Sequence, residues 1–285
     1  KQWMSFVLLS ECLRKRFFKP VTMNAPAYIF ILFERNSGMG DMIMLSPLIK
    51  AVAKSERCEK CYVVSNWDAI FDLPVSHISM KEMRLKLNRL KKGDVLVISP
   101  TLNARHSLLL FSKHLLLGYF ASNEVYSDCG QISYCYESKR EHYNNRITPL
   151  LKVFNSQISD INAYPKLLEE RPLFTLAKKY IVIAPFLRTE TRRWPEEKFI
   201  ELIEFFYTHL VGYTIYFIGS SNEEEVSYNS NLEKKINSKM VQNLTGQLTL
   251  LELNYLISRA SIFIGNDSGP AHISYLANCL SVVIF

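Results

Sequence analysis

The chain has 285 residues, of which 48% are hydrophobic, 12% aromatic and 21% charged, and its mean hydropathy is +0.00. These proportions are typical of a folded globular protein and exclude a disordered, collagen-like or coiled-coil chain. No apolar run reaches the roughly 18 residues of a membrane-spanning helix, so an integral membrane protein is not expected.

The net charge of +7 is unevenly distributed along the chain. Residues 1–120 carry 18 Lys or Arg and 9 Asp or Glu, whereas residues 121–285 carry 16 and 18. A basic first part attracts polyanions, which include nucleic acid, phosphorylated substrates and anionic bilayers. Six cysteines are too few for a disulfide framework, and Cys58 and Cys61 have no second pair at zinc-site spacing. We expect ordinary reduced thiols in a cytoplasmic protein.

The chain opens on an apolar stretch, residues 3–13, followed by basic residues interleaved with aromatic ones at 14–19. This order fits a helix packed on a domain surface or a membrane-surface contact. It does not fit a signal peptide, in which the basic cluster comes first.

Short apolar runs then alternate with helical patterns. Strands are predicted at 27–33, 61–65, 94–99, 180–185, 213–218, 261–265 and 281–285. Helices are predicted at 41–55, 102–117, 195–210, 250–259 and 270–277. Because this alternation indicates βαβ units, we predict two doubly wound domains with parallel sheets, separated by a polar stretch that ends near residue 177. Ligands bind such sheets beyond the carboxyl ends of the strands.

A turn with two glycines, residues 36–41, follows the first predicted strand. Gly38 and Gly40 allow a tight turn and a close approach of the backbone. Asp41 stands at the start of the next helix, where it can be a cap or a general base that accepts a proton from an attacking hydroxyl. Ile43 occupies the position at which the GxGxxG dinucleotide fingerprint needs a third glycine.

A loop rich in hydroxyl and guanidinium groups, residues 189–195, follows the strand at 180–185. Arg192 and Arg193 carry planar donor groups that suit phosphate oxygens, and Pro195 opens the next helix. Trp194 covers either the start of that helix or a ligand. The alternative is a solvated basic loop.

A third turn, residues 265–272, lies between a strand and a helix. Asp267 or Ser268 can cap the helix, Gly269 and Ala271 keep the backbone uncrowded, and His272 lies in the first helical turn. Free N–H groups at a helix start bind anions. A cap alone needs neither two small residues nor a histidine, so we predict a phosphate or nucleotide site here.

Three motifs in this order resemble glycosyltransferase family 9, the heptosyltransferases of bacterial lipopolysaccharide core synthesis. The most specific is the carboxyl-terminal signature, residues 243–246 followed by 250–256 and 264–272. Residues 37–41 with Pro47 resemble the amino-terminal loop of the family, and residues 193–199 resemble its middle motif. The resemblance covers residues 27–285.

The resemblance implies an α/β protein with the GT-B fold, in which two Rossmann-like doubly wound domains face each other across a cleft. We expect a basic and apolar extension at 1–26, an acceptor domain at 27–177 and a nucleotide-sugar donor domain at 178–285. The donor domain is expected to be incomplete, because the family continues beyond the position of Phe285.

The resemblance also implies the reaction: an inverting, metal-independent transfer of heptose from ADP-heptose to a lipopolysaccharide core acceptor, without a cofactor or a metal. Asp41 matches the catalytic base of the family, in the loop with Gly38 and Gly40. Arg192 falls where the family often has a Lys that holds the diphosphate. The other matches to donor-binding positions are Thr189, Glu223, Asp267, Ser268, Gly269 and His272. Phe186 and Leu187 depart from the Gly-containing turn of the family.

The expected partners are the nucleotide-sugar donor, a phosphorylated glycolipid acceptor and an anionic membrane surface. The protein is expected in the cytoplasm, bound peripherally to the inner face of the bacterial inner membrane. Two alternatives remain open: a family member that uses another nucleotide sugar, and a non-catalytic nucleotide-binding protein of the same fold. Nucleic-acid binding lacks a recognition motif, and the missing GxGxxG disfavours an oxidoreductase.

Overall fold

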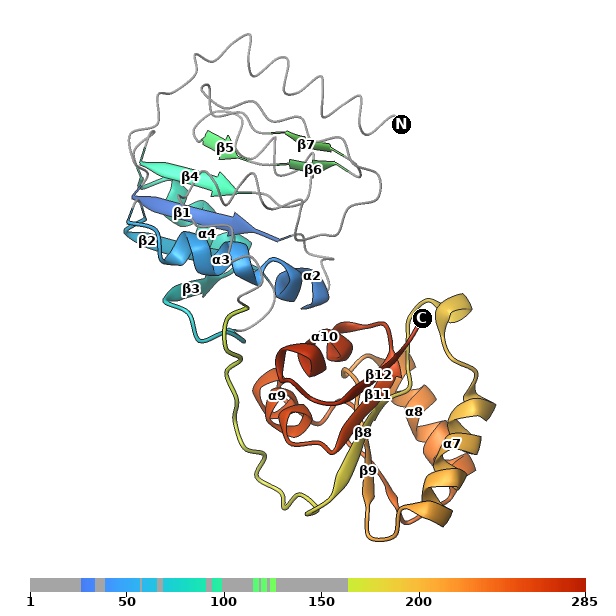
Figure 1. Cartoon of the computed structure of the whole chain (residues 1–285). Coiled ribbons are helices and arrows are strands. Elements are labelled where there is room, and N and C mark those ends of the chain that lie inside the picture. Colours follow the sequence, from blue (N-terminus) through green and yellow to red (C-terminus); the bar gives the residue numbers. More distant parts are fainter. Residues whose placement is uncertain are drawn as a thin grey trace. The chain divides into compact units, whose positions relative to one another are not determined.

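The computed structural model describes residues 27–33, 39–56, 58–65, 69–90, 94–98, 115–117, 119–121, 124–126 and 164–285, with only the backbone of residues 41, 96 and 115–126. The chain divides after Pro165 into two compact units, called here the N-terminal and the C-terminal unit (Figure 1). Among the helices that the structure describes, none combines the length and the apolar composition needed to cross a membrane.

The N-terminal unit contains a five-stranded sheet with the order β3-β2-β1-β4-β5, in which all neighbours are parallel. The strands are β1 Tyr28–Leu32, β2 Lys60–Val64, β3 Val75–Ile78, β4 Val95–Ile98 and β5 Leu115–Leu117. Strand β1 is the middle strand and is apolar throughout, as expected where helices cover both faces of a parallel sheet. Phe30 and Leu32 pack in one core cluster with Met83 and Leu87 of helix α4, Met80–Leu87.

The helix predicted at 41–55 is two helices, α2 Met39–Met44 and α3 Ser46–Ala53. Pro47 lies in the first turn of α3. Proline has no N–H to donate to the preceding turn, so it is tolerated at a helix start and breaks a helix interior. The chain therefore begins a new helix after Leu45, and Asp41 falls inside the first turn of α2.

The end of the helix predicted at 102–117 is a strand instead. Residues Leu115–Leu117 form β5 and pair in parallel with β4, while residues 102–114 lie outside the described part of the chain. A short run of leucines fits a buried strand as well as a buried helix, so periodicity could not separate the two. A hairpin of β6 Tyr119–Ala121 and β7 Glu124–Tyr126 follows.

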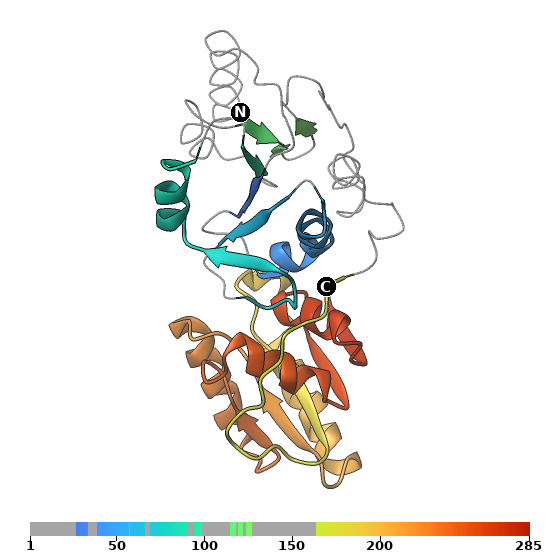
Figure 2. The same cartoon turned by 90° about the vertical axis from the view of Figure 1, so that its left-hand side faces the viewer.

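The C-terminal unit repeats the same topology, with the strand order β10-β9-β8-β11-β12 and parallel pairing throughout. The strands are β8 Tyr180–Ala184, β9 Thr214–Phe217, β10 Val241–Asn243, β11 Ile262–Asn266 and β12 Ser281–Ile284. The helices are η2 Glu190–Arg192, α7 Glu196–His209, α8 Glu223–Ile236, α9 Leu250–Ser258 and α10 Gly269–Leu276. Helices α7 and α8 cover one face of this sheet, and α9 and α10 cover the other, in front of the sheet in Figure 2. The expected α/β class with two doubly wound domains is confirmed.

Two helices that the sequence analysis did not predict, α4 and α8, begin at well-formed caps. Ser79 and Glu82 form a reciprocal capping box at the start of α4. Asn222 caps α8, because its side-chain oxygen accepts from the N–H groups of Glu224 and Glu225 at 3.1 and 3.4 Å. Both helices are polar over most of their surface, so a search for apolar periodicity passes over them. Their caps were the available signal.

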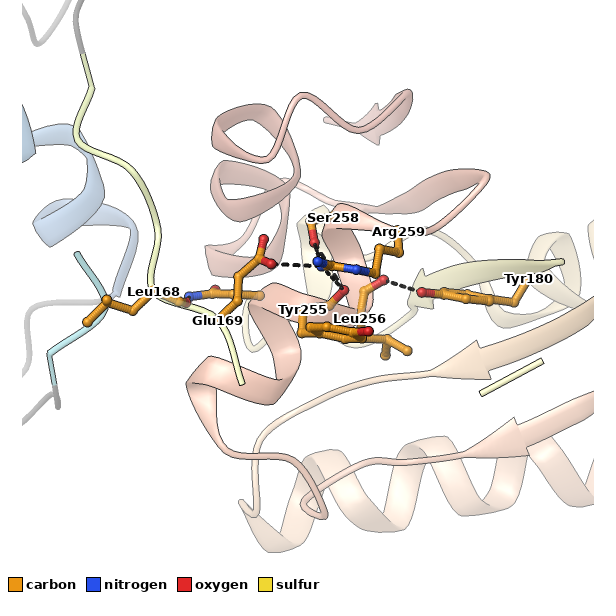
Figure 3. A network of polar contacts seen from close by, with 8 residues as sticks. Leu168, Glu169, Tyr180, Tyr255, Leu256, Ser258 and Arg259 are labelled. Carbon is orange, nitrogen blue, oxygen red and sulfur yellow. Dashed lines mark hydrogen bonds and ion pairs between the residues drawn. The ribbon is translucent and has the colours of Figure 1, made fainter. Parts of the chain in front are cut away.

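The unit boundary lies earlier than the predicted change at 177/178, because the segment from Lys166 onward is tied to the C-terminal unit. Figure 3 shows the carboxylate of Glu169 beside the guanidinium of Arg259, at 2.7 Å. The side chain of Asn254 donates to the carbonyl of Leu168 at 2.8 Å. These contacts anchor the segment on α9, so residues 166–177 belong with the second sheet.

Candidate functional site

The strongest candidate site lies at the carboxyl ends of β8 and β11 in the C-terminal unit. These two strands are neighbours in the middle of the sheet, and the strand order reverses between them. A reversal of this kind is where doubly wound sheets bind their ligands. The loop after β8 carries Arg192, and the turn after β11 carries Asp267, so two of the predicted motifs meet at this point.

Arg192 and Asp267 form an ion pair across this point, with 2.6 Å between Nη2 of Arg192 and Oδ2 of Asp267. The Arg192 side chain is 52% exposed and the Asp267 side chain is 31% exposed. Thr189 lies exposed at the start of η2, where its carbonyl accepts the N–H of Arg192 at 3.0 Å. The pair fixes the direction of the Arg192 guanidinium and leaves most of its five N–H donors available to a ligand.

The turn at 267–272 leaves the start of α10 open. Ser268 occupies the cap position of α10, but its side chain makes no capping hydrogen bond, and Asp267 bonds Arg192 instead of capping. Ser268 thus takes the cap position that the sequence offered to Asp267 or Ser268, but without a side-chain hydrogen bond. Pro270 has no N–H, and the N–H of Ala271 donates to the carbonyl of Ser268 at 3.1 Å, so the start of α10 offers an anion the N–H of Gly269 and the positive end of the helix dipole. His272 lies half-buried in the same turn.

Arg193 has a different role from Arg192. Its guanidinium lies 4.4 Å from the ring centre of Phe186 and 4.7 Å from that of Tyr228, and its Nε donates to the carbonyl of Leu187 at 2.8 Å. The Glu224 carboxylate forms an ion pair with the same guanidinium, with 3.5 Å between Oε1 of Glu224 and Nη2 of Arg193. The Arg193 side chain is only 14% exposed, so this guanidinium stabilises the loop, and Arg192 stays the predicted diphosphate ligand of the two.

Trp194 covers the start of α7, which is one of the two roles predicted for it. Its ring meets the ring of Phe199 edge-on, with the centroids 4.7 Å apart. The same core cluster contains Ile203 of α7 and Ile183 of β8. The packing of Trp194 against this core gives the loop a fixed end.

Asn266, the last residue of β11, also belongs to this site. It lies within the predicted turn 265–272, but it was not predicted as a site residue. Its side chain is completely buried. The side chain donates to the carbonyl of Pro185 and accepts the N–H of Trp194, both at 2.8 Å. The only sequence signal was its place just before Asp267.

The three adjacent glutamates at the start of α8 point to different surroundings. Glu223 is exposed at the first position of the helix, and Glu224 faces Arg193. Glu225 turns inward, where its carboxylate accepts the hydroxyl of Ser220 at 2.5 Å and lies against Gly219. Burial raises the pKa of the Glu225 carboxyl above its usual value.

Two of the three predicted residues of the N-terminal unit lie in the described helix that follows β1. Gly40 and Asp41 belong to α2, which follows β1 by six residues. Gly38 and the side chain of Asp41 lie outside the described residues. Within the described part of the chain, no group of three or more His, Cys, Asp or Glu side chains could hold a metal ion.

Residues 156–281 match the family model of glycosyltransferase family 9 (heptosyltransferase). A lipopolysaccharide heptosyltransferase 3 of Escherichia coli is 29% identical over 110 residues, which is 39% of this chain and 32% of that protein. A second one, from strain K12, is 26% identical over 113 residues. The chain thus spans about a third of the length of the curated relatives it matches.

Solved structures of one family 9 glycosyl transferase and of two heptosyltransferases share the fold over most of the chain. A family 9 glycosyl transferase from Veillonella parvula has a TM-score of 0.66 and 17% identity, over 92% of this chain and 81% of its own. The E. coli ADP-heptose heptosyltransferase II has a TM-score of 0.61 and 16% identity, over 90% and 84%. An E. coli heptosyltransferase with bound ADP-2-deoxy-2-fluoro heptose has a TM-score of 0.59 and 16% identity, over 90% and 88%. The chain has the fold of these heptosyltransferases, as expected, and its residues 156–281 match the model of glycosyltransferase family 9.

Proposed function

We propose that this protein is an inverting glycosyltransferase that moves a heptose from ADP-heptose to a lipopolysaccharide core acceptor without a metal ion. The observation that carries the proposal is the Arg192–Asp267 pair beside the open start of α10, at the strand reversal of a family 9 domain. Relatives named lipopolysaccharide heptosyltransferase 3, and a structure named for its bound ADP-heptose analogue, support the choice of donor and acceptor.

The donor is proposed to bind through its diphosphate. Arg192 contributes a permanent positive charge with planar donor geometry, and the start of α10 contributes the backbone N–H of Gly269 and the positive end of the helix dipole. As the bond to the sugar breaks, negative charge gathers on the departing diphosphate. Groups that already point at this charge stabilise the transition state, and they would do the work that a divalent cation does elsewhere.

Asp41 is proposed as the general base. It would accept the proton of the acceptor hydroxyl as that oxygen attacks the anomeric carbon from the face opposite the nucleotide. The bond from oxygen to the anomeric carbon forms, and the bond from that carbon to the diphosphate breaks, which inverts the configuration. We also propose that the donor is contacted by Thr189, Glu223 and His272.

The N-terminal unit is proposed to take the phosphorylated acceptor and to lie against an anionic membrane surface on its cytoplasmic side. Lys81, Arg84 and Leu85 of α4 and Arg89, which lies two residues beyond the end of this helix, are all exposed, with Leu85 at 55%. The one acidic residue of α4, Glu82, is engaged in the capping box. A basic helix face with an exposed leucine is suited to anionic lipid headgroups.

A family member that uses another nucleotide sugar is the second candidate. The contacts that carry the proposal recognise a diphosphate, which all nucleoside-diphosphate sugars share. A non-catalytic nucleotide-binding protein would share these contacts too, but it would not need a base at Asp41.

The test is a transfer assay on the full chain in the presence of EDTA, with ADP-heptose and a lipid A–Kdo acceptor, and with ADP release as the readout. We expect acceptor-dependent ADP release that EDTA does not reduce. GDP-linked and UDP-linked sugars serve as comparison donors, and faster turnover of one of them would replace ADP-heptose. ADP release that requires added Mg²⁺ would contradict the metal-free mechanism. Nucleotide binding without ADP release would favour the alternative of a non-catalytic nucleotide-binding protein.

A further inference from the structure

One buried amide holds both ends of the loop that carries Arg192. Asn266 donates from Nδ2 to the carbonyl of Pro185 and accepts at Oδ1 the N–H of Trp194, each at 2.8 Å. Pro185 is the first residue after β8, and Trp194 stands just before α7. The two residues lie 81 and 72 positions from Asn266 in the sequence. The side chain therefore closes the loop 185–194 at its base.

The next residue along the chain holds the tip of the same loop. Asp267 pairs with the Arg192 guanidinium at 2.6 Å, and its own N–H donates to the carbonyl of Ile284 in β12 at 3.0 Å. Three points of the loop are thus fixed by two consecutive residues at the end of β11. Residues 188–192 are otherwise exposed.

Only a side chain with both a donor and an acceptor can make the two contacts of Asn266. A backbone carbonyl only accepts and a backbone N–H only donates, so the partners fix which end of the amide is oxygen and which is nitrogen. An aspartate would place a carboxylate against the Pro185 carbonyl, and an apolar residue would leave both backbone groups buried and unbonded. The amide also adds no charge next to the Arg192–Asp267 pair.

We propose that Asn266 is a positioning residue of the donor site: it fixes the loop 185–194 so that the Arg192 guanidinium stands beside the start of α10. Asn266 does not touch the diphosphate itself and acts through Arg192. The inference rests on the proposed function, because it gives Arg192 the role of diphosphate ligand.

The experiment is a double-mutant cycle on the full chain, with ADP affinity measured by titration calorimetry in EDTA. Arg192→Ala should weaken ADP binding roughly tenfold to a hundredfold, because a charge-assisted contact is lost. Asn266→Ala should weaken it about fivefold to twentyfold. The double variant should bind ADP no more than about twofold more weakly than Arg192→Ala, because coupled residues do not add.

Asn254→Ala is the matched control, because Asn254 is also completely buried and also donates to a backbone carbonyl, at 2.8 Å, but on α9. It should lower thermal stability and leave the Kd for ADP unchanged. If the alanine variant does not fold, Asn266→Ser is the substitute, because serine keeps a polar group at this position. Its shorter side chain cannot make both contacts of the amide. Asn266→Ser should therefore weaken ADP binding in the same coupled way.

Two results would overturn the inference while leaving the proposed function intact: ADP affinity unchanged in both Asn266 variants although Arg192→Ala weakens it, or fully additive losses in the double variant. Unchanged affinity would mean that Asn266 acts on stability alone, and additive losses would mean that it affects ADP binding independently of Arg192. Unchanged ADP affinity in Arg192→Ala would instead contradict the proposed diphosphate site, and the inference would fall with it.

Discussion

Two adjacent arginines are predicted to respond to truncation in opposite ways. Arg193 is 14% exposed, lies against the rings of Phe186 and Tyr228, and donates to the Leu187 carbonyl. Cation–π contacts contribute about 0.5–2 kcal/mol each, and a hydrogen bond from a charged donor about 1.5–3 kcal/mol. Because these contributions are not additive, we expect Arg193→Ala to lower the free energy of unfolding by about 2–4 kcal/mol.

Arg192 is 52% exposed, and its pair with Asp267 is open to water. Pairs of this kind contribute about 0.2–1 kcal/mol. Arg192→Ala should therefore cost little stability and a large part of the ADP affinity.

The assay is urea unfolding of the full chain, followed by the fluorescence of its tryptophans and by circular dichroism, with ADP titrations on the same samples. Arg193→Lys is the control, because it keeps the charge and loses the planar fork; it should recover only part of the stability. The reasoning would be refuted if Arg192→Ala cost as much stability as Arg193→Ala, or if Arg193→Ala unfolded at the wild-type urea concentration.

Three further predictions concern the base, a partly buried acid and the membrane face. Asp41→Asn should keep the fold and slow transfer by about 10²–10⁴, and near-normal turnover would remove Asp41 from the mechanism. Burial raises the pKa of the Glu225 carboxyl above its usual value of about 4.5, so this carboxyl keeps its proton to higher pH in the folded protein than in the unfolded chain. The free energy of unfolding therefore falls as the pH rises from about 4.5. Glu225→Gln should flatten this fall in urea titrations between pH 4.5 and 7, and an equal slope in both proteins would contradict the account. Each basic residue near an anionic surface contributes about 1 kcal/mol. The affinity for phosphatidylserine vesicles, measured by sedimentation, should therefore fall roughly a hundredfold in the triple variant Lys81→Ala, Arg84→Ala and Arg89→Ala. Undiminished or salt-independent binding would exclude α4 and Arg89 as the contact.

The sequence was sufficient for the elements that build the site. Strand β8 is an unbroken apolar run, and the turn at 267–272 joins an apolar strand to a helix with proline in its first turn. Such local signals placed Arg192 and Asp267 at the ends of strands. Parallel pairing then brings strand ends to one edge of a sheet, so their proximity followed from the fold class.

The sequence was not sufficient to separate Arg192 from Arg193. Arg193 is held by Tyr228 and Glu224 of α8, a helix whose polar surface hid it from the periodicity search. Asn266 escaped selection for another reason: Pro185 and Trp194 meet it only through the pairing of β8 with β11. Contacts between residues far apart in the sequence need the sheet to be assembled before they can be predicted.

The central claim is that the C-terminal unit binds a nucleoside diphosphate through fixed positive groups. The most direct measurement is titration calorimetry of the full chain with ADP in EDTA, for the wild type, Arg192→Ala and His272→Ala. We expect metal-free binding that each substitution weakens by about 1.5–3 kcal/mol, or roughly tenfold to a hundredfold. Binding that requires Mg²⁺, or an ADP affinity that neither substitution changes, would contradict it and leave the turn at 267–272 as the start of an ordinary helix.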